Sequence, residues 1–303
     1  MTQPLIIGAG PAGIRAAQTL VAAGLRPLVV DEAPACGGQI YRQPLVPDGR
    51  SARARYGSEA PKATALHTAF NGLRGQIDYF PNALVWNLEP GFADLALDGT
   101  AQRFAHTGLI LATGATDRIL PVPGWTLPGV FTLGGAQIAL KAQGCAIGRK
   151  LVFVGSGPLL YLVAWQYLKA GVKVAAVLDS APARAKLALV RGLALAPKIV
   201  LRGLKFGLDL KLAGVRLVSG VEQVRIEGTA RVEGISWRAG GREQHLQCDG
   251  IGYGLSLRPE TQLADLSGCA FHFSERDRAW LPVRDKAGRS SVAGVYLAGD
   301  GAG

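Results

Sequence analysis

The sequence predicts an α/β protein in which one strand–helix–strand unit occurs twice. Residues 5–32 read LIIGAGPAGIRAAQTLVAAGLRPLVVDE, and residues 152–179 read VFVGSGPLLYLVAWQYLKAGVKVAAVLD. Each stretch has a β-branched strand, a glycine-rich turn, a helix-length apolar pattern and a second apolar strand ending in an acid. In both, a capping glycine (Gly24, Gly171) follows the first loop glycine by 16 residues (8 to 24, 155 to 171). Two parallel sheets with helices on both faces are therefore expected.

The first unit carries a complete G-x-G-x-x-G in Gly8, Gly10 and Gly13, directly between a strand and a helix. Gly8 permits the tight turn, Gly10 lets a pyrophosphate approach the backbone, and Gly13 lets the helix lie close to the strand. Asp31 ends the second strand, where its carboxylate can accept hydrogen bonds from both ribose hydroxyls. The combination predicts a dinucleotide site with its phosphates at the helix N-terminus.

A second glycine-rich segment, Cys36-Gly37-Gly38-Gln39, follows that strand. Its two glycines let the backbone pass close to a flat ring system, and Gln39 offers an amide to it; an ordinary surface turn is the alternative. The four cysteines form no C-x-x-C pair, which excludes a closely spaced dithiol and gives no zinc pattern. Scattered thiols fit a reducing compartment, so a cytoplasmic location is expected.

The second unit departs from the first at two positions. Gly155 and Gly157 match Gly8 and Gly10, but Leu160 replaces the third glycine. Counted from the first loop glycine, Leu178 takes the position of Asp31, and Asp179 follows one residue later. Strand alternation would point the Asp179 side chain to the opposite face of the sheet unless the strand end twists. We expect a retained fold with a relaxed ligand; nucleotide binding through Gly155, Gly157, Pro158 and Asp179 is the alternative.

The chain is expected to fold as two domains, one inserted into the other. Residues 1–120 and 250–303 would form the first domain, and residues 121–249 the second. The strand in TGLILATG (107–114) ends in a small-residue turn, and a proline- and glycine-rich connection follows it. Short alternating stretches after Gly220 predict a meander, and the last strand leads into Gly299-Asp300-Gly301.

The net charge of +11 is unevenly distributed. Residues 184–216 contain eight basic residues and one acid, a local charge of +7. This helical excursion is either a solvated face or a docking surface for an acidic partner; no aromatic interleaving points to nucleic acid. No apolar run approaches the roughly 18 residues that a transmembrane helix needs, and no basic region precedes the strand at residues 5–7, so no secretory signal is expected.

Together GAGPAG, GGQIY, LATG and LAGD resemble the pyridine-nucleotide–disulfide reductase-like flavoproteins. VVDEAPACGGQIYR, TLGGAQIALKAQG, VGSGPLL and GRSSVAGVYLAGDGAG resemble one branch of that family over most of the chain. The branch holds the FAD-binding A or alpha subunits of opine oxidases, proline or hydroxyproline dehydrogenases and sarcosine oxidase, with the hydrogen cyanide synthase B subunit. The resemblance implies two Rossmann-like dinucleotide-binding domains of three-layer ββα type, an NAD(P)-binding-like domain being inserted into a split FAD-binding domain.

The resemblance also implies roles for individual residues. The FAD pyrophosphate would be held by Gly8, Gly10, Pro11, Ala12 and Gly13, and the adenosine ribose by Asp31 and Glu32. Gly38 and Gln39 would approach the flavin, and Val85 would lie near the adenine. Ala112, Thr113 and Gly114 would form the small-residue turn, and Gly299 and Asp300 would contact the ribityl-phosphate region. Branch members continue past the final GDGAG, so the end at Gly303 is expected to be either a truncation or a natural short form.

The resemblance implies an FAD-dependent oxidoreductase subunit of a hetero-oligomer that acts on an amino or imino acid such as an opine, hydroxyproline, proline or sarcosine. A second flavoprotein subunit would carry the substrate site, and a further partner would be an iron–sulfur subunit. The four histidines are scattered and form no acid–base constellation, so no catalytic residue is assigned. A stand-alone NAD(P)H-dependent ferredoxin or quinone reductase and a non-catalytic nucleotide-binding scaffold are the alternatives.

Overall fold

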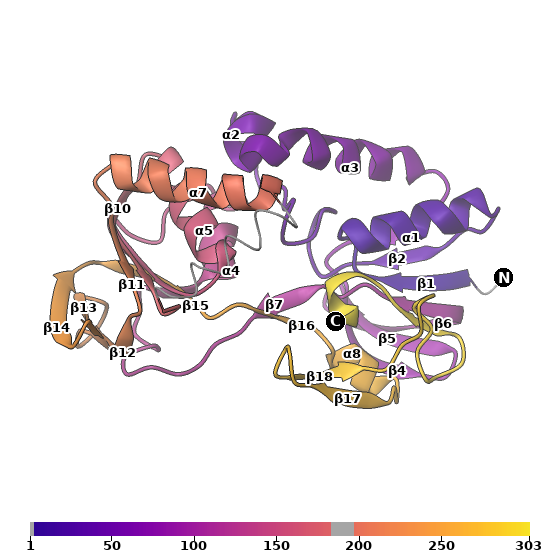
Figure 1. The fold of residues 1–303 in the computed structure, drawn as a ribbon. Coiled ribbons are helices and arrows are strands. Elements are labelled where there is room, and N and C mark those ends of the chain that lie inside the picture. The colour runs from indigo at the N-terminus through magenta and orange to yellow at the C-terminus, as the bar shows by residue number, and fades with distance from the viewer. Residues whose placement is uncertain (1–2, 183–196) are drawn as a thin grey trace. The chain divides into compact units, whose positions relative to one another are not determined.

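The protein is described by a computed structural model that covers residues 3–182 and 197–303 (Figure 1). Contacts divide the chain into two compact units, Met1–Thr116 with Arg258–Gly303, and Asp117–Leu257. The segments that connect them pair as strands β7 (Ala115–Asp117) and β16 (Leu257–Pro259). Part of the basic excursion predicted at 184–216, namely residues 184–196, lies outside the described residues.

The first unit is built on a parallel sheet. Its strand order is β3-β2-β1-β6, and β19 pairs with the other side of β6. The antiparallel strands β4 and β5 extend from the first half of β6. The bounds are β1 (Gln3–Ile7), β2 (Leu28–Val30), β3 (Asp78–Phe80), β4 (Leu84–Glu89), β5 (Phe92–Leu97), β6 (Thr100–Leu111) and β19 (Val295–Leu297).

Helices and short elements complete the first unit. They are α1 (Pro11–Ala22), α2 (Ala52–Tyr56), η1 (Gly57–Glu59), α3 (Ala60–Leu73), α8 (Gln262–Leu266), the hairpin β17 (Phe271–Ser274) and β18 (Ala279–Pro282), and η3 (Gly299–Ala302). Helix α1 begins with Pro11, which lacks a backbone N–H that the first turn could not satisfy in any case. It ends before Gly24, whose φ of +78° confirms the predicted cap.

The second unit repeats this plan. Its parallel sheet has the order β11-β10-β9-β15-β8, and an antiparallel meander, β12-β13-β14, accompanies it as predicted. The sheet strands are β8 (Val130–Thr132), β9 (Lys150–Gly155), β10 (Lys173–Asp179), β11 (Arg216–Ser219) and β15 (Gly250–Gly254). The meander strands are β12 (Glu222–Glu227), β13 (Gly234–Ala239) and β14 (Arg242–Gln247), and the helices are α4 (Leu133–Lys141), α5 (Pro158–Lys169) and α7 (Pro197–Leu212).

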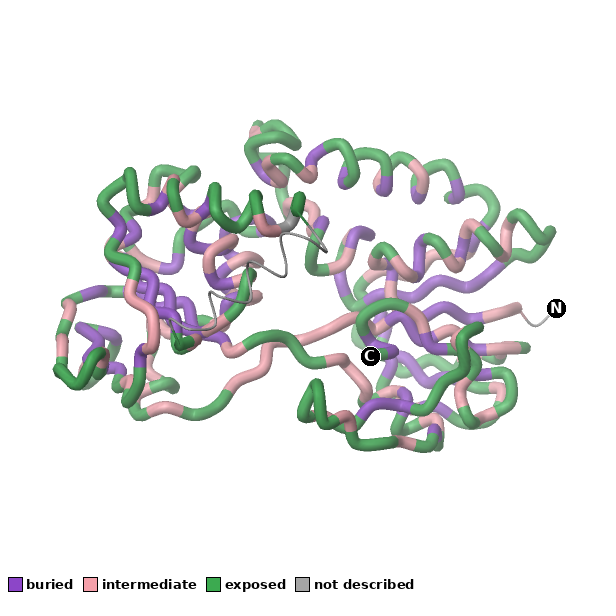
Figure 2. Tube along the Cα trace, in the orientation of Figure 1, coloured by how far each residue is buried: buried purple, intermediate pink, exposed green. Residues whose placement is uncertain are grey.

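Each unit has three layers, and strand alternation decides which layer a side chain meets. In β1, Leu5 and Ile7 pack with residues of β4 and β5, whereas Ile6 packs with α1 and α3. In β9, Leu151 and Phe153 pack with α4 and α5, and Val152 and Val154 pack with the meander. Figure 2 shows the buried residues concentrated along the strands of each unit.

The ββα arrangement implied by the resemblance is thus present, but the expectation of helices on both faces of each sheet is wrong. One face is covered by antiparallel strands, because the chain leaves the parallel sheet through hairpins that bury their own alternating apolar side chains. The second domain boundary also moves from 250 to 258, because β15 pairs with β9 and β8 inside the second unit. In the described part of the chain, no helix is both long and apolar enough to cross a membrane.

Candidate dinucleotide site

The glycine loop of the first unit is packed as its three glycines require. At Gly8, with φ of +105°, an added Cβ would lie 2.3 Å from the carbonyl oxygen of Ala112. At Gly13 it would lie 1.8 Å from the carbonyl oxygen of Gly8, so only glycine lets α1 approach this closely. Gly10 differs, because an added Cβ would meet only the Cα of Gly38, at 3.7 Å. The protein itself therefore leaves space at Gly10, which is the space that a pyrophosphate needs.

Asp31 lies at the carboxyl end of β2, beside this loop. Its Oδ1 accepts a hydrogen bond of 2.7 Å from the Ala33 amide, and its Oδ2 accepts one from the Ala9 amide within the glycine loop. The residue is 8% exposed, and burial raises the pKa of its carboxyl group, an effect that the two amides oppose. The carboxylate is thus fixed in orientation and largely shielded from solvent, which suits an acid that accepts hydrogen bonds from ribose hydroxyls.

The structure brings the other predicted segments of this unit to the same place. The Gly37 amide donates a 2.8 Å hydrogen bond to the carbonyl of Ala9, which holds the GGQ segment against the glycine loop. An added Cβ at Gly299 would lie 2.7 Å from the Cβ of Ala12, so the final loop reaches the start of α1. An added Cβ at Gly301 would lie 2.6 Å from Oγ1 of Thr113. Segments from residues 8, 37, 113 and 299 therefore converge on one site.

The remaining predicted residues are less constrained. Glu32, Gln39 and Asp300 are exposed. Val85 is 8% exposed and its side chain lies in the core beneath the parallel sheet, so only its backbone is available to a ligand. Its strand is nevertheless anchored to the site, because the amide of Ala83 donates a 2.9 Å hydrogen bond to the carbonyl of Asp31.

Arg42 and Tyr79 were missed by the sequence analysis. The Nε atom of Arg42 and the hydroxyl of Tyr79 are buried and have no hydrogen-bond partner among the described residues. Both side chains interact electrostatically with Asp31. The charge of Arg42 lowers the pKa of Asp31. The pKa of Tyr79 is raised mainly by burial and further by the charge of Asp31. Buried polar atoms without partners are costly, so a polar ligand bound beside Asp31 would stabilise these two groups.

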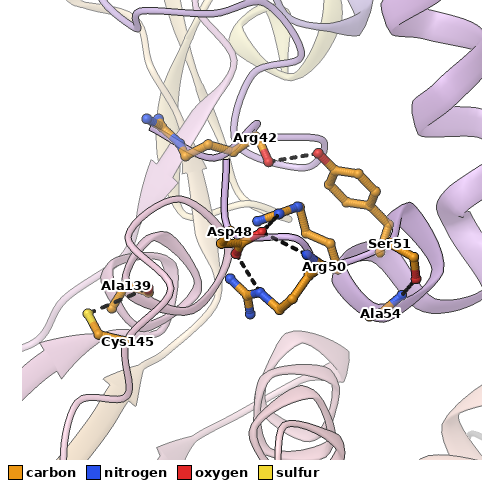
Figure 3. A network of polar contacts seen from close by, with 9 residues as sticks. Arg42, Asp48, Arg50, Ser51, Ala54, Ala139 and Cys145 are labelled. Carbon is orange, nitrogen blue, oxygen red and sulfur yellow. Dashed lines mark hydrogen bonds and ion pairs between the residues drawn. The ribbon is translucent and has the colours of Figure 1, made fainter. Parts of the chain in front are cut away.

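Unlike Arg50 and Arg55, which follow it in the chain, Arg42 does not contact Asp48. Figure 3 shows Asp48 contacting Arg50, while the side chain of Arg42 points away from this cluster. Asp48 also accepts a hydrogen bond from Arg55. The backbone carbonyl of Arg42 accepts a 3.0 Å hydrogen bond from the Tyr56 hydroxyl, which fixes the chain where the side chain departs. Within the described residues, no ion pair neutralises Arg42. These features fit the diphosphate of a dinucleotide.

The loop of the second unit has a different backbone. Gly155 plays the part of Gly8, since an added Cβ would lie 1.8 Å from the carbonyl oxygen of Gly254 on the neighbouring strand. Gly157, however, has φ of +82°, where Gly10 has −75°. Leu160 is fully buried in the core with α4, and the altered loop accommodates it where the first unit needs a glycine. The second unit thus keeps the fold with a glycine loop of different conformation.

The prediction that Leu178 takes the place of Asp31 is wrong. In the first unit Ile7 pairs with Val30, so Gly8 and Asp31 follow together at the strand ends. In the second unit Gly155 pairs directly with Asp179. The register shifts between Val174 and Ala176, so β10 accommodates one extra residue there and a simple count is displaced by one.

The hydrogen bonds around Asp179 repeat those around Asp31, except that a different donor contacts Oδ2. Its Oδ1 accepts a 2.9 Å hydrogen bond from the Ala181 amide, and its carbonyl accepts one of 3.1 Å from the Val221 amide. Its Oδ2, by contrast, accepts a 2.8 Å hydrogen bond from the hydroxyl of Tyr161 on α5, not from the glycine loop. Leu178 packs against the meander instead. The acid is thus retained in position but is held by a side chain.

The histidines of the described residues do not gather around the dinucleotide site, except for His67 beside Tyr41. His67 contacts the carbonyl of Tyr41 at 2.9 Å and His245 contacts Glu227 at 2.9 Å, and no group of metal-ligating side chains is present in that part of the chain. Burial raises the pKa of the Cys36 thiol to about 11, so the thiol stays protonated near neutrality. Cys36 is therefore a packing residue of the loop.

The fold and this loop arrangement are those of a protein with two dinucleotide-binding units. Residues 2–303 match the family described as pyridine nucleotide-disulphide oxidoreductase, and the chain belongs to that family. It is 40% identical over 311 residues to the A polypeptide of opine oxidase from Rhizobium meliloti, covering 99% of this chain and 58% of that protein. It is 34% identical over 312 residues to the HcnB polypeptide of hydrogen cyanide synthase from Pseudomonas protegens, covering 98% of this chain and 65% of that protein.

Among solved structures, the L-proline dehydrogenase from P. horikoshii superposes with a TM-score of 0.71 at 19% identity, covering 99% of this chain and 50% of that chain. At this identity the likeness shows the fold alone. The chain spans about three fifths of the length of the opine oxidase polypeptides that it matches. These findings confirm the predicted family resemblance, and they make the chain an FAD-dependent oxidoreductase polypeptide.

Proposed function

We propose that this chain is the electron-handling FAD subunit of a multi-subunit dehydrogenase or oxidase acting on an amino or imino acid, such as an opine, hydroxyproline, proline or sarcosine. One observation carries the proposal: four separate segments and the buried Asp31 converge on one candidate dinucleotide site. The similar proteins are named as subunits of opine oxidase and hydrogen cyanide synthase, which supports a partner-dependent enzyme.

The residues of the first unit would divide the work of holding FAD. The open side of Gly10 would admit the pyrophosphate, and Arg42 would balance its charge. Asp31 would accept the ribose hydroxyls, and the GGQ segment would approach the flavin. Gly299 and Asp300 would contact the ribityl-phosphate region, beside the small-residue turn at Thr113 and Gly114. When bound, FAD supplies the redox chemistry, so the protein needs only to position it and tune its surroundings. The substrate would bind on a second flavoprotein subunit, and the further electron carrier would be an iron–sulfur subunit.

Reconstitution with and without a partner tests this function. The chain alone, loaded with FAD, should show a flavin spectrum but no turnover of sarcosine, proline, hydroxyproline or an opine. The complex purified from its native cells should oxidise one of these and bleach the flavin of this chain. Turnover by the isolated chain would contradict the subunit role.

A stand-alone NAD(P)H-dependent flavoprotein reductase is the second candidate, and the position of Asp179 opposite Gly155 favours it. Rapid anaerobic reduction of the flavin by NADH or NADPH would establish it. A non-catalytic scaffold is the third reading, and a chain that binds no flavin at all would support it.

A further inference from the structure

Helix α7 of the second unit exposes an apolar stripe. Leu201, Leu204, Leu208 and Leu212 are 58%, 53%, 56% and 78% exposed. Their spacing of three, four and four residues returns to one side of an α-helix at each turn and spans about 16 Å along the axis. Figure 2 shows α7 exposed over most of its length. Four exposed leucines in register form a patch, which isolated surface leucines do not.

The opposite side of α7 is the one that the fold uses. Phe206 and Leu210 are 9% and 0% exposed, and the ring of Phe206 lies 4.9 Å from that of Trp165 on α5. Asp209 accepts a 2.8 Å hydrogen bond from Trp165 Nε1 and pairs with Lys169 at 3.3 Å. At 100° per residue, Phe206 and Leu210 lie roughly opposite the leucine stripe. Among the described residues, the contacts of α7 with α5 are therefore made by the side opposite the leucines.

Exposed basic side chains border the stripe. Lys205 and Lys198 lie along one edge and Lys211 along the other, and all three are exposed. The only acid in α7, Asp209, is already engaged by α5. A partner that buries the leucines must therefore bring negative charge to both edges.

Resting on the proposed subunit role, we propose that the leucine stripe of α7 is the docking surface for an amphipathic helix of the partner subunit, with leucine-like residues on its apolar face and Asp or Glu on its flanks. The recurrence at i, i+3, i+7 and i+11 is the geometry in which one helix packs along another. The lysine borders fix the sign of the partner's charge, and their contribution weakens as salt screens it.

The experiment uses the FAD-loaded chain and the partner subunit identified by mass spectrometry in the native complex and then produced separately. Binding is measured for the wild type, for Leu204→Asn with Leu208→Asn, and for Lys205→Glu with Lys211→Glu. Leu25→Asn with Leu266→Asn and Lys286→Glu, which alter exposed residues of the first unit, are the matched controls. Flavin content and the circular dichroism spectrum show that each variant is folded.

The leucine variant should lose at least tenfold in affinity, and the lysine variant should lose affinity mainly at low salt, while the controls bind as the wild type does. If both α7 variants bind the partner normally, the docking surface is wrong although the subunit role stands. If no polypeptide accompanies the chain in the native material, the subunit role fails as well. Binding of the wild type, but not the leucine variant, to phosphatidylglycerol vesicles in preference to the partner would assign the stripe to a membrane surface and overturn the proposal.

Discussion

The hydroxyl of Tyr161 donates a 2.8 Å hydrogen bond to the carboxylate of Asp179, which lies directly opposite Gly155 in the sheet of the second unit. In the first unit the corresponding oxygen of Asp31 is held by the Ala9 amide of the glycine loop. The second unit thus keeps an acid at the ribose position and ties it to a neighbouring helix. Together with the altered loop at Gly157, this supports the expectation of a relaxed nucleotide site.

We predict that NADH and NADPH reduce the bound flavin slowly or not at all, and that Tyr161→Phe accelerates the reaction. The substitution removes a donor that competes with a ribose hydroxyl, worth about 1.5–3 kcal/mol, or roughly tenfold or more in affinity. Anaerobic stopped-flow absorbance of the flavin measures the rate. Tyr167→Phe is the control, because its hydroxyl donates to the carbonyl of Ala136 elsewhere in the unit. Bleaching of the wild-type flavin by micromolar NADH would contradict the prediction and favour the reductase reading.

Gly10→Val should abolish FAD binding with little effect on folding. The φ of Gly10 is −75°, which any residue adopts, and an added Cβ meets only Gly38 at 3.7 Å. The added methyl groups would instead occupy the space of the pyrophosphate. Equilibrium titration of the apo-protein with FAD measures binding, and thermal melting of the apo-protein measures stability. Gly72→Ala on α3 is the control, because no atom lies within 4 Å of the added Cβ. Flavin bound equally well by the Val variant would mean that the pyrophosphate lies elsewhere.

The sequence was sufficient for the strand–loop–helix units, because Gly8, Gly13 and Gly155 are fixed by close backbone approaches and the capping glycines by their positive φ, which leaves a regular spacing. It was insufficient for the register of β10, because one extra residue within an apolar strand changes neither composition nor alternation visibly. The importance of Arg42 was also hidden. The burial of its Nε atom arises from tertiary packing, which no motif in the sequence records.

Cys36 should resist alkylation in the folded protein. The thiolate is the reactive form, and a pKa of about 11 leaves about one thiol in a thousand ionised at pH 8. Reactivity should therefore rise as the pH approaches 11. Mass spectrometry after brief iodoacetamide treatment compares Cys36 with the exposed Cys145, which serves as the internal control. Equal labelling of the two thiols at pH 8 would show that the loop around Cys36 opens readily and would return the residue to consideration as a redox group.

Arg42→Gln should weaken FAD binding by roughly ten- to a hundredfold, since a hydrogen bond to a charged group contributes about 1.5–3 kcal/mol. The Nε atom of Arg42 is buried without a partner among the described residues, so an anionic ligand would gain a donor that is already desolvated. Salt dependence separates this role from a structural one, because the variant should lose part of the salt sensitivity of binding along with the affinity. Quenching of FAD fluorescence at two ionic strengths measures both. Arg53→Gln, an exposed arginine on α2, removes the same charge nearby and should bind FAD as the wild type does. Equal losses in the two variants would reduce the effect to overall charge and remove Arg42 from the site.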